Sequence, residues 1–419
     1  MPVCLRLTLF LVLNGKKVAE DFSIDSNEAV ELKLVRNVAD VEDDSASFNP
    51  EMSHQIFGEN ESIFGYKNLQ IQLYYTAGNL TTYLGMKYDA KIDPKRFGGL
   101  EADDVLPPLI EKLQPGFHTN LDEFIKAIEQ ERNFKPFGTL DHAFTVTLPE
   151  GTDRHFEVYH CEITDKGFLS YHERLQTFLL WYVDAASFID VDDDKWTFFL
   201  LFEKYTVDGE NRYAISGYGT VYRYYAYPNR IRPRISQFLI LPPFQRIGLG
   251  VELLEAIYRH FQSDPKVLDI AVEDPSEQFV RLRDFVDCKA CLKLKSFQRE
   301  NVRKGFSQDM VQEAQNKLKL NKKQTRRVFE ILRFKATNTG DAEDYKQYRL
   351  LIKQRLNIPY QKEQNDIAKL RKALNTEELQ AAMSMASKEV QIVELDKLYR
   401  ELEENYRKII ERLATANLN

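Results

Sequence analysis

One stretch of the chain, residues 236–276, contains a strand, a glycine-rich turn, a helix and a second strand in immediate succession. Residues 238–241 are apolar and β-prone, and the two prolines that follow end the strand. Beyond the turn, residues 253–261 show apolar side chains at helical spacing. Glu273 follows the second predicted strand, residues 267–272. Ligands bind outside the carboxyl ends of strands in α/β units, so we expect the functional site here.

The turn itself, residues 245–250, contains Gly248 and Gly250 directly before the helix. Glycines allow a tight turn whose backbone N–H groups point one way, and the helix N-terminus adds unpaired donors and partial positive charge. Such a turn can bind a pyrophosphate. A Walker loop is excluded because Gly-Lys-Ser/Thr is absent, and a dinucleotide fingerprint because Leu253 replaces its third glycine. A plain strand-turn-helix connection without a ligand explains the same residues equally well.

The remaining pattern, Gln/Arg-x-x-Gly-x-Gly/Ala, is similar to the pyrophosphate loop of the GNAT acyltransferases, which hold coenzyme A. The segments RPRISQFLILPPFQRIGLG (232–250) and LDIAVEDPSEQFVRLRDF (268–285) resemble the type B histone acetyltransferase catalytic subunits more closely. Other blocks of this resemblance follow one order: ELKLVR (31–36), FGYK (64–67), KPFGTL (135–140), YHERLQTFL (171–179) and ASFIDVDDDKW (186–196). The resemblance extends from Glu28 into the mid-350s, with a looser helical match beyond.

The resemblance implies an α+β fold, in which a GNAT-type mixed β-sheet is flanked by helices. Three domains are expected: a mixed α/β domain over 1–134, the acetyltransferase domain over 135–299, and an all-helical domain over 300–419. The pattern of apolar residues predicts the following helices and strands: helices 109–113, 121–128 and 171–185, and strands 69–75, 144–148, 156–161, 196–205 and 213–227. Residues 207–209 are the predicted turn of a hairpin. Residues 69–75 alternate apolar and polar side chains, as a half-buried strand does.

Acetyl transfer to an amine needs a base. A lysine amine has a pKa of about 10.4, so roughly one in a thousand is a free nucleophile at neutral pH, and a base contributes ~10² to ~10⁴ in rate. We assign this role to Glu273, for which an exposed strand-end carboxylate is the alternative reading. Asp274 is expected to cap the next helix, with Pro275 at its first position. By resemblance, Asp184 could act as a second base, and Asp274 shares the candidate catalytic site.

The resemblance also implies contacts to the two substrates. The residues expected to hold acetyl-coenzyme A are Phe238, Leu239, Ile240, Gln245, Arg246, Ile247, Gly248, Leu249, Gly250, Val251 and Ser276. The residues expected to contact a basic peptide are Glu59, Glu61, Trp196, Tyr222, Arg223 and Tyr224. Four aspartates within 190–194 stand beside these aromatics, an arrangement that suits a lysine-rich tail. The alternatives to substrate contact are that the tyrosines pack in the core and that the acidic residues form a solvated loop.

Composition narrows the class of protein. The chain has 57 lysines and arginines against 64 acids, a net charge of −7, which argues against wrapping nucleic acid and permits a basic substrate. Four cysteines in 419 residues do not form a disulfide framework, so a reducing compartment is expected. Cys288 and Cys291 have incidental spacing on a helix, and no metal is expected. The apolar run 3–13 is too short for a membrane span, and residues 1–27 depart from the family pattern.

Helices dominate beyond residue 300. Two are predicted at 310–320 and 325–334, and Pro359 interrupts a later segment. The last helix repeats apolar residues every seven positions: Ile392, Leu395, Tyr399, Leu402, Tyr406, Ile409 and Leu413. Dimerisation and packing on the same chain both explain this repeat. A basic patch at 317–327 is read as a solvated helix face, an import signal or a surface for an acidic chaperone.

The sequence therefore predicts a histone-lysine N-acetyltransferase. The resemblance implies direct transfer from acetyl-coenzyme A to tail lysines of free, newly made histone H4, partnership with a WD-repeat histone-binding protein, and residence in nucleus and cytoplasm. Direct binding to nucleic acid or membrane is not expected. Two alternatives remain: a GNAT acyltransferase acting on another protein or a small amine, and a histone-chaperone scaffold with little catalysis. An intact glycine turn and Glu273 argue against the scaffold, which needs neither.

Overall fold

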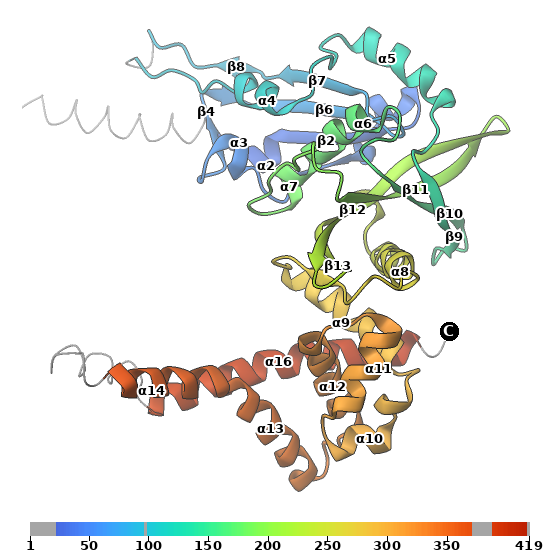
Figure 1. Cartoon of the computed structure of the whole chain (residues 1–419). Coiled ribbons are helices and arrows are strands. Elements are labelled where there is room, and N and C mark those ends of the chain that lie inside the picture. Colours follow the sequence, from blue (N-terminus) through green and yellow to red (C-terminus); the bar gives the residue numbers. More distant parts are fainter. Residues whose placement is uncertain (1–21, 96–98, 371–387, 417–419) are drawn as a thin grey trace, which may run out of the picture. The chain divides into compact units, whose positions relative to one another are not determined.

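The computed structural model describes residues 22–95, 99–370 and 388–416 (Figure 1). The chain divides into two compact units, one of residues 1–223 and 235–257 and the other of residues 224–234 and 258–419. The three-domain division stays a prediction. The apolar run 3–13 lies outside the described residues. No helix in the described part of the chain combines the length and apolar character that crossing a bilayer requires.

The first unit opens with a four-stranded sheet, ordered β3-β2-β6-β7. Its strands are β2 (Val30–Val35), β3 (Ser47–Phe48), β6 (Gln70–Thr76) and β7 (Thr82–Lys87). β2 and β6 are parallel, whereas the other pairs are antiparallel. The prediction that β6 is half-buried is wrong, because every residue after Gln70 is buried. Tyr74 packs with Phe124 on one face of the sheet. On the other face, the ring of Tyr75 packs at a tilt against Phe178, with centroids 4.6 Å apart.

Short elements surround this sheet. They are β1 (Ser23–Asp25), α2 (Ser26–Ala29), α3 (His54–Phe57), β4 (Ser62–Phe64), β5 (Tyr66–Lys67), β8 (Ala90–Lys91), α4 (Leu106–Lys112) and α5 (Leu121–Gln130). The predicted helices at 109–113 and 121–128 are confirmed in α4 and α5. Asn120 caps α5 by accepting from the N–H of Asp122 at 2.8 Å. Phe124 and Ile128 then face the sheet core, as their helical spacing requires.

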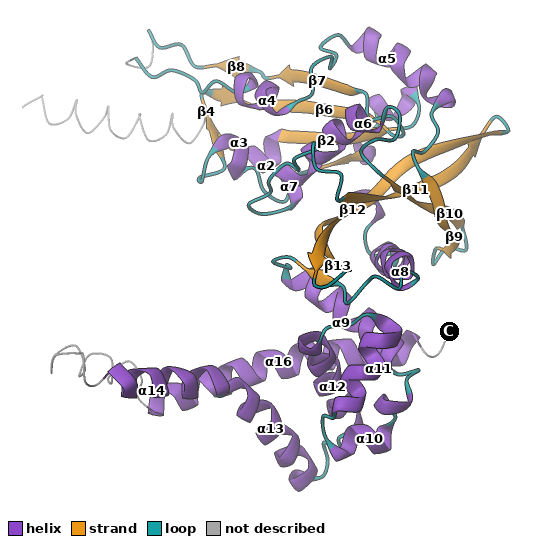
Figure 2. Cartoon of the chain, in the orientation of Figure 1, coloured by secondary structure: helices purple, strands orange, loops and turns teal. Residues whose placement is uncertain are grey.

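A second sheet has six strands in the order β14-β13-β12-β11-β10-β9 (Figure 2). Its strands are β9 (Thr139–Thr147), β10 (Asp153–Cys161), β11 (Trp196–Val207), β12 (Glu210–Ala226), β13 (Arg230–Ile240) and β14 (Ala271–Val272). β9 to β12 pair antiparallel in chain order. The predicted hairpin turn is confirmed, because Asp208 and Gly209 both have positive φ, as a tight turn between twisted strands requires.

The predicted strand 267–272 is shorter in the structure. Only Ala271 and Val272 form β14. Val267 instead forms a single bridge to Ile231, and Ile270 forms one to Leu320. Two separate bridges to different segments cannot make a continuous ladder, so the strand begins later than its apolar residues indicate.

The predicted helix 171–185 is also interrupted. It consists of α6 (Phe168–Leu175), the 3₁₀ turn Gln176–Phe178 and α7 (Leu179–Tyr182). Val183 is extended, with φ −129°, and Ala185 has φ 52°. The helix therefore ends before Asp184, which lies on the connection that follows.

His172 on α6 is fully buried, and within the described residues neither of its ring nitrogens has a hydrogen-bond partner. Burial lowers the pKa of His172 to about 4. Because the unfolded chain binds this proton near pH 6.5, the folded state loses stability as the pH falls from there towards 4. The ring of His172 lies between Phe168 and Phe198, so phenylalanine suits this site. Between about pH 8 and pH 5, we expect the unfolding free energy of His172→Phe to fall by about 2 kcal/mol less than that of the wild type.

Urea denaturation at both pH values measures this effect. His155→Phe, at an exposed position on β10, is the control and should leave the pH dependence unchanged. An unaltered loss of stability towards pH 5 in His172→Phe would show that this ring is not responsible.

The second unit is largely helical. Its helices are α9 (Glu277–Cys291), α10 (Arg299–Lys304), α11 (Gln308–Leu318), α12 (Lys322–Ala336), α13 (Ala342–Leu356), α14 (Ile358–Leu370) and α16 (Lys388–Ala416). The two helices predicted at 310–320 and 325–334 are confirmed in α11 and α12. Pro359 lies in the first turn of α14, where its missing N–H costs no intrahelical bond. Cys288 and Cys291 are buried on α9.

The seven-residue repeat of α16 packs on its own chain. Leu395, Tyr399, Tyr406, Ile409 and Leu413 are all buried, and α16 packs against α9, α12 and α13. Ile392 is 65% exposed, so the first position of the repeat is outside this packing. Of the two explanations, packing on the same chain is confirmed over 395–413.

Candidate active site

The glycine-rich turn lies between β13 and α8 (Leu249–Gln262). A 3₁₀ turn, Pro242–Phe244, ends β13, and the side chain of Gln245 donates to the carbonyl of Ile240 at 2.9 Å. This bond ties the turn to the end of the strand. Arg246 and Gly248 have φ values of 68° and 95°. These left-handed conformations reverse the chain just before the first turn of α8, whose leading N–H groups have no intrahelical partners.

The space in front of Gly248 is open. Gly248 is exposed, and a Cβ built on it would meet no atom within 4 Å. The N–H of Val251, by contrast, donates to the carbonyl of Gly248 at 3.0 Å. The turn therefore offers its donors at Gly248 to Gly250 rather than at Val251. An exposed reversed turn at the N-terminus of a 14-residue helix fits the diphosphate of a coenzyme.

The strand before the turn carries three predicted cofactor residues, Phe238, Leu239 and Ile240, of which Leu239 is buried. β12 passes close to them, since a Cβ on Gly217 would lie 2.6 Å from the carbonyl oxygen of Leu239. Glycine is therefore required at position 217. The N–H of Leu241 donates to Ser216 at 2.9 Å and fixes the strand end. Two further predicted coenzyme contacts lie next to the glycines. Ile247 is half-buried in the turn, and Leu249 is buried at the first position of the helix.

A buried ionic cluster that sequence reasoning missed packs against Phe244, just before the turn. Glu203, 4% exposed, accepts two bonds from Arg154 at 2.7 Å each and one from Arg36. The guanidinium carbons of Arg154 and Arg36 lie 5.2 and 5.8 Å from the ring centroid of Phe244. Burial alone would raise the pKa of Glu203, but hydrogen bonds and charges from Arg154 and Arg36 lower it. Glu203 is the one acid in the strand Trp196–Val207, and it directly follows the apolar run Phe198–Phe202, which was the available signal.

Gly248→Val should weaken binding of acetyl-coenzyme A by about tenfold or more, because its Cβ would occupy the space where the diphosphate approaches the backbone. The same change at Gly151 is the matched control: that turn glycine has φ 88° and equally open surroundings. Calorimetric titration measures both affinities. Equal affinities for Gly248→Val and Gly151→Val would show that the glycine turn does not hold the coenzyme.

Glu273 directly follows β14 in the second unit. Its carboxylate lies 3.3 Å from Nη1 of Arg234, whose guanidinium carbon stands 4.4 Å from the ring centroid of Tyr224. Glu273, the predicted base, and Tyr224, a predicted peptide contact, therefore both contact Arg234 on β13. The side chain of Glu273 is 40% exposed, so a proton can be passed to or from it.

The expectation that Asp274 caps the next helix is wrong. Ser276 is the cap of α9: its side chain accepts from the N–H of Phe279 at 3.2 Å, and the helix begins at Glu277. Asp274 has φ 28°, whereas Ser276 is extended with φ −60° and ψ 159°, the usual geometry of a capping residue. Asp274 is therefore left outside the helix, beside Glu273 in the chain, and Ser276 combines its predicted coenzyme contact with a structural bond.

His54, which sequence reasoning missed, connects two predicted site residues. Its Nε2 lies 3.3 Å from Asp184 and its Nδ1 3.5 Å from Glu61. Glu61 also accepts from the N–H groups of Ser53 and His54 at 2.6 and 3.0 Å, the first of which chiefly lowers its pKa. Glu61 thus holds the start of α3. Glu59 is exposed, and no ion pair involves it within the described residues.

The predicted acidic and aromatic residues lie together around Tyr222. Trp196 and Tyr222 form an edge-to-face pair with centroids 5.0 Å apart. The hydroxyl of Tyr222 donates to Asp193 at 2.7 Å, which raises the pKa of Tyr222 and lowers the pKa of Asp193. Tyr218 is fully buried and serves packing.

Arg223 holds the acidic loop in place. Its guanidinium donates to the carbonyl oxygens of Asp194 and Lys195, and it lies 3.3 Å from Glu162. These contacts tie the loop to β12. Arg223 therefore positions the acids next to the aromatic pair.

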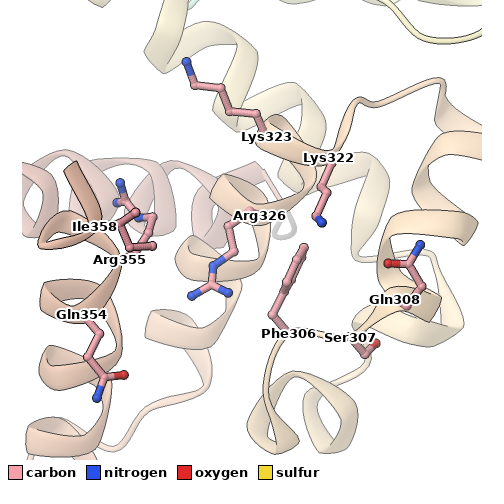
Figure 3. A pocket seen from close by; sticks show the side chains of 9 residues that line it. All are labelled: Phe306, Ser307, Gln308, Lys322, Lys323, Arg326, Gln354, Arg355 and Ile358. Carbon is pink, nitrogen blue, oxygen red and sulfur yellow. The ribbon is translucent and has the colours of Figure 1, made fainter. Parts of the chain in front are cut away.

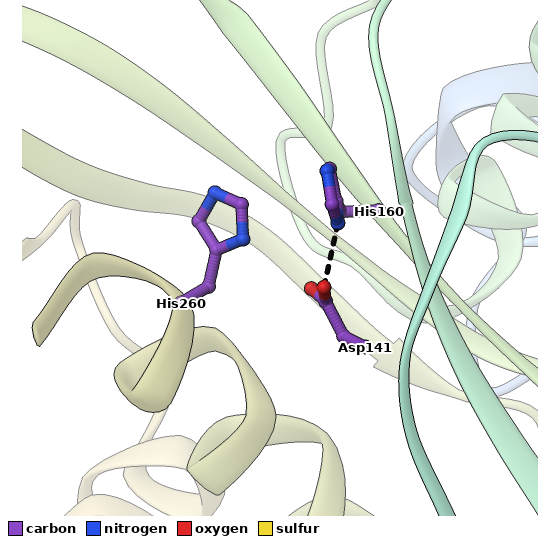
Figure 4. A group of neighbouring side chains, drawn as sticks. All are labelled: Asp141, His160 and His260. Atoms are coloured by element: carbon purple, nitrogen blue, oxygen red, sulfur yellow. Dashed lines mark hydrogen bonds and ion pairs between the residues drawn. The ribbon is translucent and has the colours of Figure 1, made fainter. Parts of the chain in front are cut away.

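Asp141 and His160, on β9 and β10, form a 2.7 Å hydrogen bond (Figure 4). The expectation that no metal is used stays a prediction. An imidazole and a carboxylate satisfy one another without a metal, so we assign this pair no catalytic role.

A strand, an open glycine turn at a helix N-terminus and an acid after the next strand fit the class of acetyltransferases. Two family models match: "Histone acetyl transferase HAT1 N-terminus" over residues 22–184 and "Histone acetyltransferase type B catalytic subunit, C-terminal" over 283–334. The chain belongs to the family of type B histone acetyltransferase catalytic subunits. The resemblance, the α+β fold class and the enzyme class, a histone acetyltransferase, are thereby confirmed.

The chain is similar to curated members of this family along most of its length. It is 50% identical to the human subunit over 95% of each chain, and 50% identical to the mouse subunit over 95% of this chain and 96% of that one. A Dictyostelium discoideum member is 33% identical over 93% and 96%. A crystal structure of a soil metagenomic aminoglycoside acetyltransferase aligns at 14% identity and a TM-score of 0.22, over 36% of this chain and 91% of that one, values too low to strengthen the assignment.

Proposed function

We propose that this chain transfers acetyl from acetyl-coenzyme A directly to tail lysines of free, newly made histone H4 before chromatin assembly. The observation that carries the proposal is the open, reversed glycine turn at the start of α8, in a chain of this family. The Asp193, Tyr222 and Trp196 cluster supports a basic peptide as acceptor, because ammonium groups bind carboxylates while lysine methylenes pack on rings.

Acetyl-coenzyme A supplies an activated acetyl group. The backbone donors of Gly248 to Gly250 would bind its diphosphate, and donors on residues 238–240 would stabilise the thioester oxygen as negative charge develops there. Glu273 removes the proton from the attacking lysine nitrogen. The new amide C–N bond forms as the C–S bond breaks; the departing thiolate takes up a proton from solvent, and Glu273 releases to solvent the proton that it accepted. Asp184 and Asp274 remain candidates for a second base.

The predicted peptide contacts divide into two kinds. Glu59 is exposed and can pair with a lysine of the tail, whereas Glu61 is engaged by three protein donors: Ser53, His54 and Asn27. Trp196, Tyr222 and Tyr224 offer ring surfaces. Arg223 acts through the acidic loop that it holds rather than as a cation facing a basic tail.

Glu59→Lys should raise KM for an H4 tail peptide about fivefold or more and leave KM for acetyl-coenzyme A and the melting temperature unchanged, because it reverses an exposed charge. Glu61→Lys should lower the melting temperature, because the start of α3 loses its acceptor. Steady-state kinetics with thermal denaturation separates the two variants. A rise in both KM values for Glu59→Lys would show that its role is structural.

Two further proposals follow from the family. The chain acts with a WD-repeat histone-binding protein, and it resides in both nucleus and cytoplasm, without binding nucleic acid or membrane directly. Co-purification of the tagged chain from separated nuclear and cytoplasmic fractions tests both. Recovery without any WD-repeat protein from either fraction would contradict the first.

Substrate competition decides between the proposal and its alternatives. Peptides of the H4 and H3 tails and a small polyamine are offered together, and mass spectrometry locates the acetyl groups. Acetylation of H4 tail lysines supports the proposal, and acetylation mainly of the polyamine favours a different GNAT activity. Coenzyme binding without transfer to any amine favours the scaffold.

A further inference from the structure

The helical unit contains a cationic groove between α12, the start of α14 and the segment before α11 (Figure 3). Its volume is about 990 Å³. The residues that matter here are Phe306, Lys322, Lys323, Arg326, Arg355 and Ile358. We call this cavity the α12 groove. None of these residues belongs to the acetyl-transfer site described above.

The α12 groove has an excess of positive charge. Arg326 and Arg355 share one buried carboxylate, Glu330, whose oxygens lie 3.1 Å from Nε of Arg326 and 2.8 Å from Nε of Arg355. Lys322 and Lys323 are exposed, and neither has an ion pair within the described residues. Over the described part of the chain, the lining residues therefore include four cations and no acid, and Glu330 pairs only with the two arginines. The two lysines remain available to a ligand.

The position of the two lysines is unfavourable for the helix itself. They are the first two residues of α12, directly after the capping residue Asn321, which accepts from the N–H of Gln324 at 2.9 Å. The partial positive charge of a helix N-terminus favours acids there and disfavours cations. Helix stability thus gives no reason for Lys322 and Lys323, and such a local conflict is typical of a functional site.

Apolar surface lies beside these charges. Ile358, in the first turn of α14, is 59% exposed, and Phe306 is only partly buried beneath Arg326, whose guanidinium carbon is 4.9 Å from the ring centroid. Lys322 and Arg326 extend on either side of the Phe306 ring, while Lys323 points away from them (Figure 3). The cations are therefore spread along the groove instead of converging on one point.

We propose that the α12 groove docks an acidic peptide segment of a partner protein. Its carboxylates pair with Lys322 and Lys323, and one apolar side chain packs on Phe306 and Ile358. Charge complementarity selects the acidic segment, and the exposed apolar residues select a peptide over a free phosphate, which needs converging donors and no apolar anchor. A volume near 1,000 Å³ is at the upper limit of small-molecule pockets and suits several residues of a chain.

The probe is a short fluorescent peptide of glutamates with two leucines, titrated against the full chain and followed by anisotropy. A peptide with glutamine for each glutamate and an oligonucleotide of equal charge are titrated in parallel. The test variant is Lys322→Glu with Lys323→Glu, and the control reverses Lys335 and Lys397, two other exposed lysines of the same unit. Ile358→Ser tests the apolar anchor.

We expect the test variant to bind the acidic peptide at least about tenfold more weakly, and the control to bind like the wild type. The melting temperature of the test variant should rise, because acids replace cations at the N-terminus of α12, so lost binding is not mistaken for lost folding. Lys322→Gln with Lys323→Gln should give an intermediate affinity. Unchanged affinity in the test variant, equal binding of the glutamine peptide, or binding of the oligonucleotide alone would overturn the proposal.

Discussion

Glu273→Gln should lower kcat/KM for the H4 tail by ~10² to ~10⁴ near neutral pH, because the amide cannot accept the proton of the attacking lysine. The loss should shrink at alkaline pH. Roughly one lysine in ten is deprotonated about one unit below its pKa of 10.4, against about one in a thousand at pH 7.4. The rate of the variant should therefore rise more steeply with pH than that of the wild type.

Glu277→Gln is the matched control for this experiment. Glu277 lies four residues further along the chain and has its own arginine partner, Arg281, at 3.3 Å, the same distance that separates Glu273 from Arg234. We expect its pH–rate profile to follow the wild type. A parallel loss at every pH in Glu273→Gln would indicate that the carboxylate acts on structure and is not the base.

The second large effect is expected at Glu203, the acid beneath the glycine turn. Glu203→Gln should destabilise the fold by about 3 kcal/mol, because two arginines lose a buried counter-charge; partial exposure of Arg36 and Arg154 keeps the cost at the lower end for such pairs. KM for acetyl-coenzyme A should also rise, since the arginines pack on Phe244 just before the turn, while KM for the peptide should not.

The pH dependence has a defined sign. Because the folded-state pKa of Glu203 is lowered, its stabilisation is present above the unfolded pKa and is lost as the pH falls through the folded value. The difference in unfolding free energy between wild type and variant should therefore be largest at neutral pH and decrease below about pH 4. Glu210→Gln, which changes an exposed acid paired with the largely buried Arg212, is the control. A constant difference down to acid pH would show that charge is not the cause.

Local patterns predicted much of this fold. The helical spacing of residues 253–261 identified α8, and the Asp208 and Gly209 turn identified the β11–β12 hairpin. Both depend on residues that are neighbours in sequence. The acids and aromatics around Tyr222 were also predicted together, because β11 and the loop before it are joined to β12 by that one hairpin.

The remaining features depend on contacts between distant segments. Arg36 and Glu203 are 167 residues apart in the sequence, and His54 and Asp184 are separated by a comparable number of residues. No local period reveals such pairs. The burial of β6 was missed for the same reason. Two separate segments cover its two faces, whereas the alternation of apolar and polar residues indicates only one buried face.

The capping residue of α9 was missed for a different reason. Asp274 and Ser276 are both good capping residues, and composition alone does not choose between them. The backbone does, because Asp274 has a positive φ and Ser276 an extended one.

Acetylation of free histone H4 is measured by radiolabelled acetyl transfer from acetyl-coenzyme A to free core histones, with the same histones in nucleosomes offered separately. We expect label on free histone H4 and little on nucleosomal H4. Wild-type protein that binds acetyl-coenzyme A and labels no free histone would contradict this expectation.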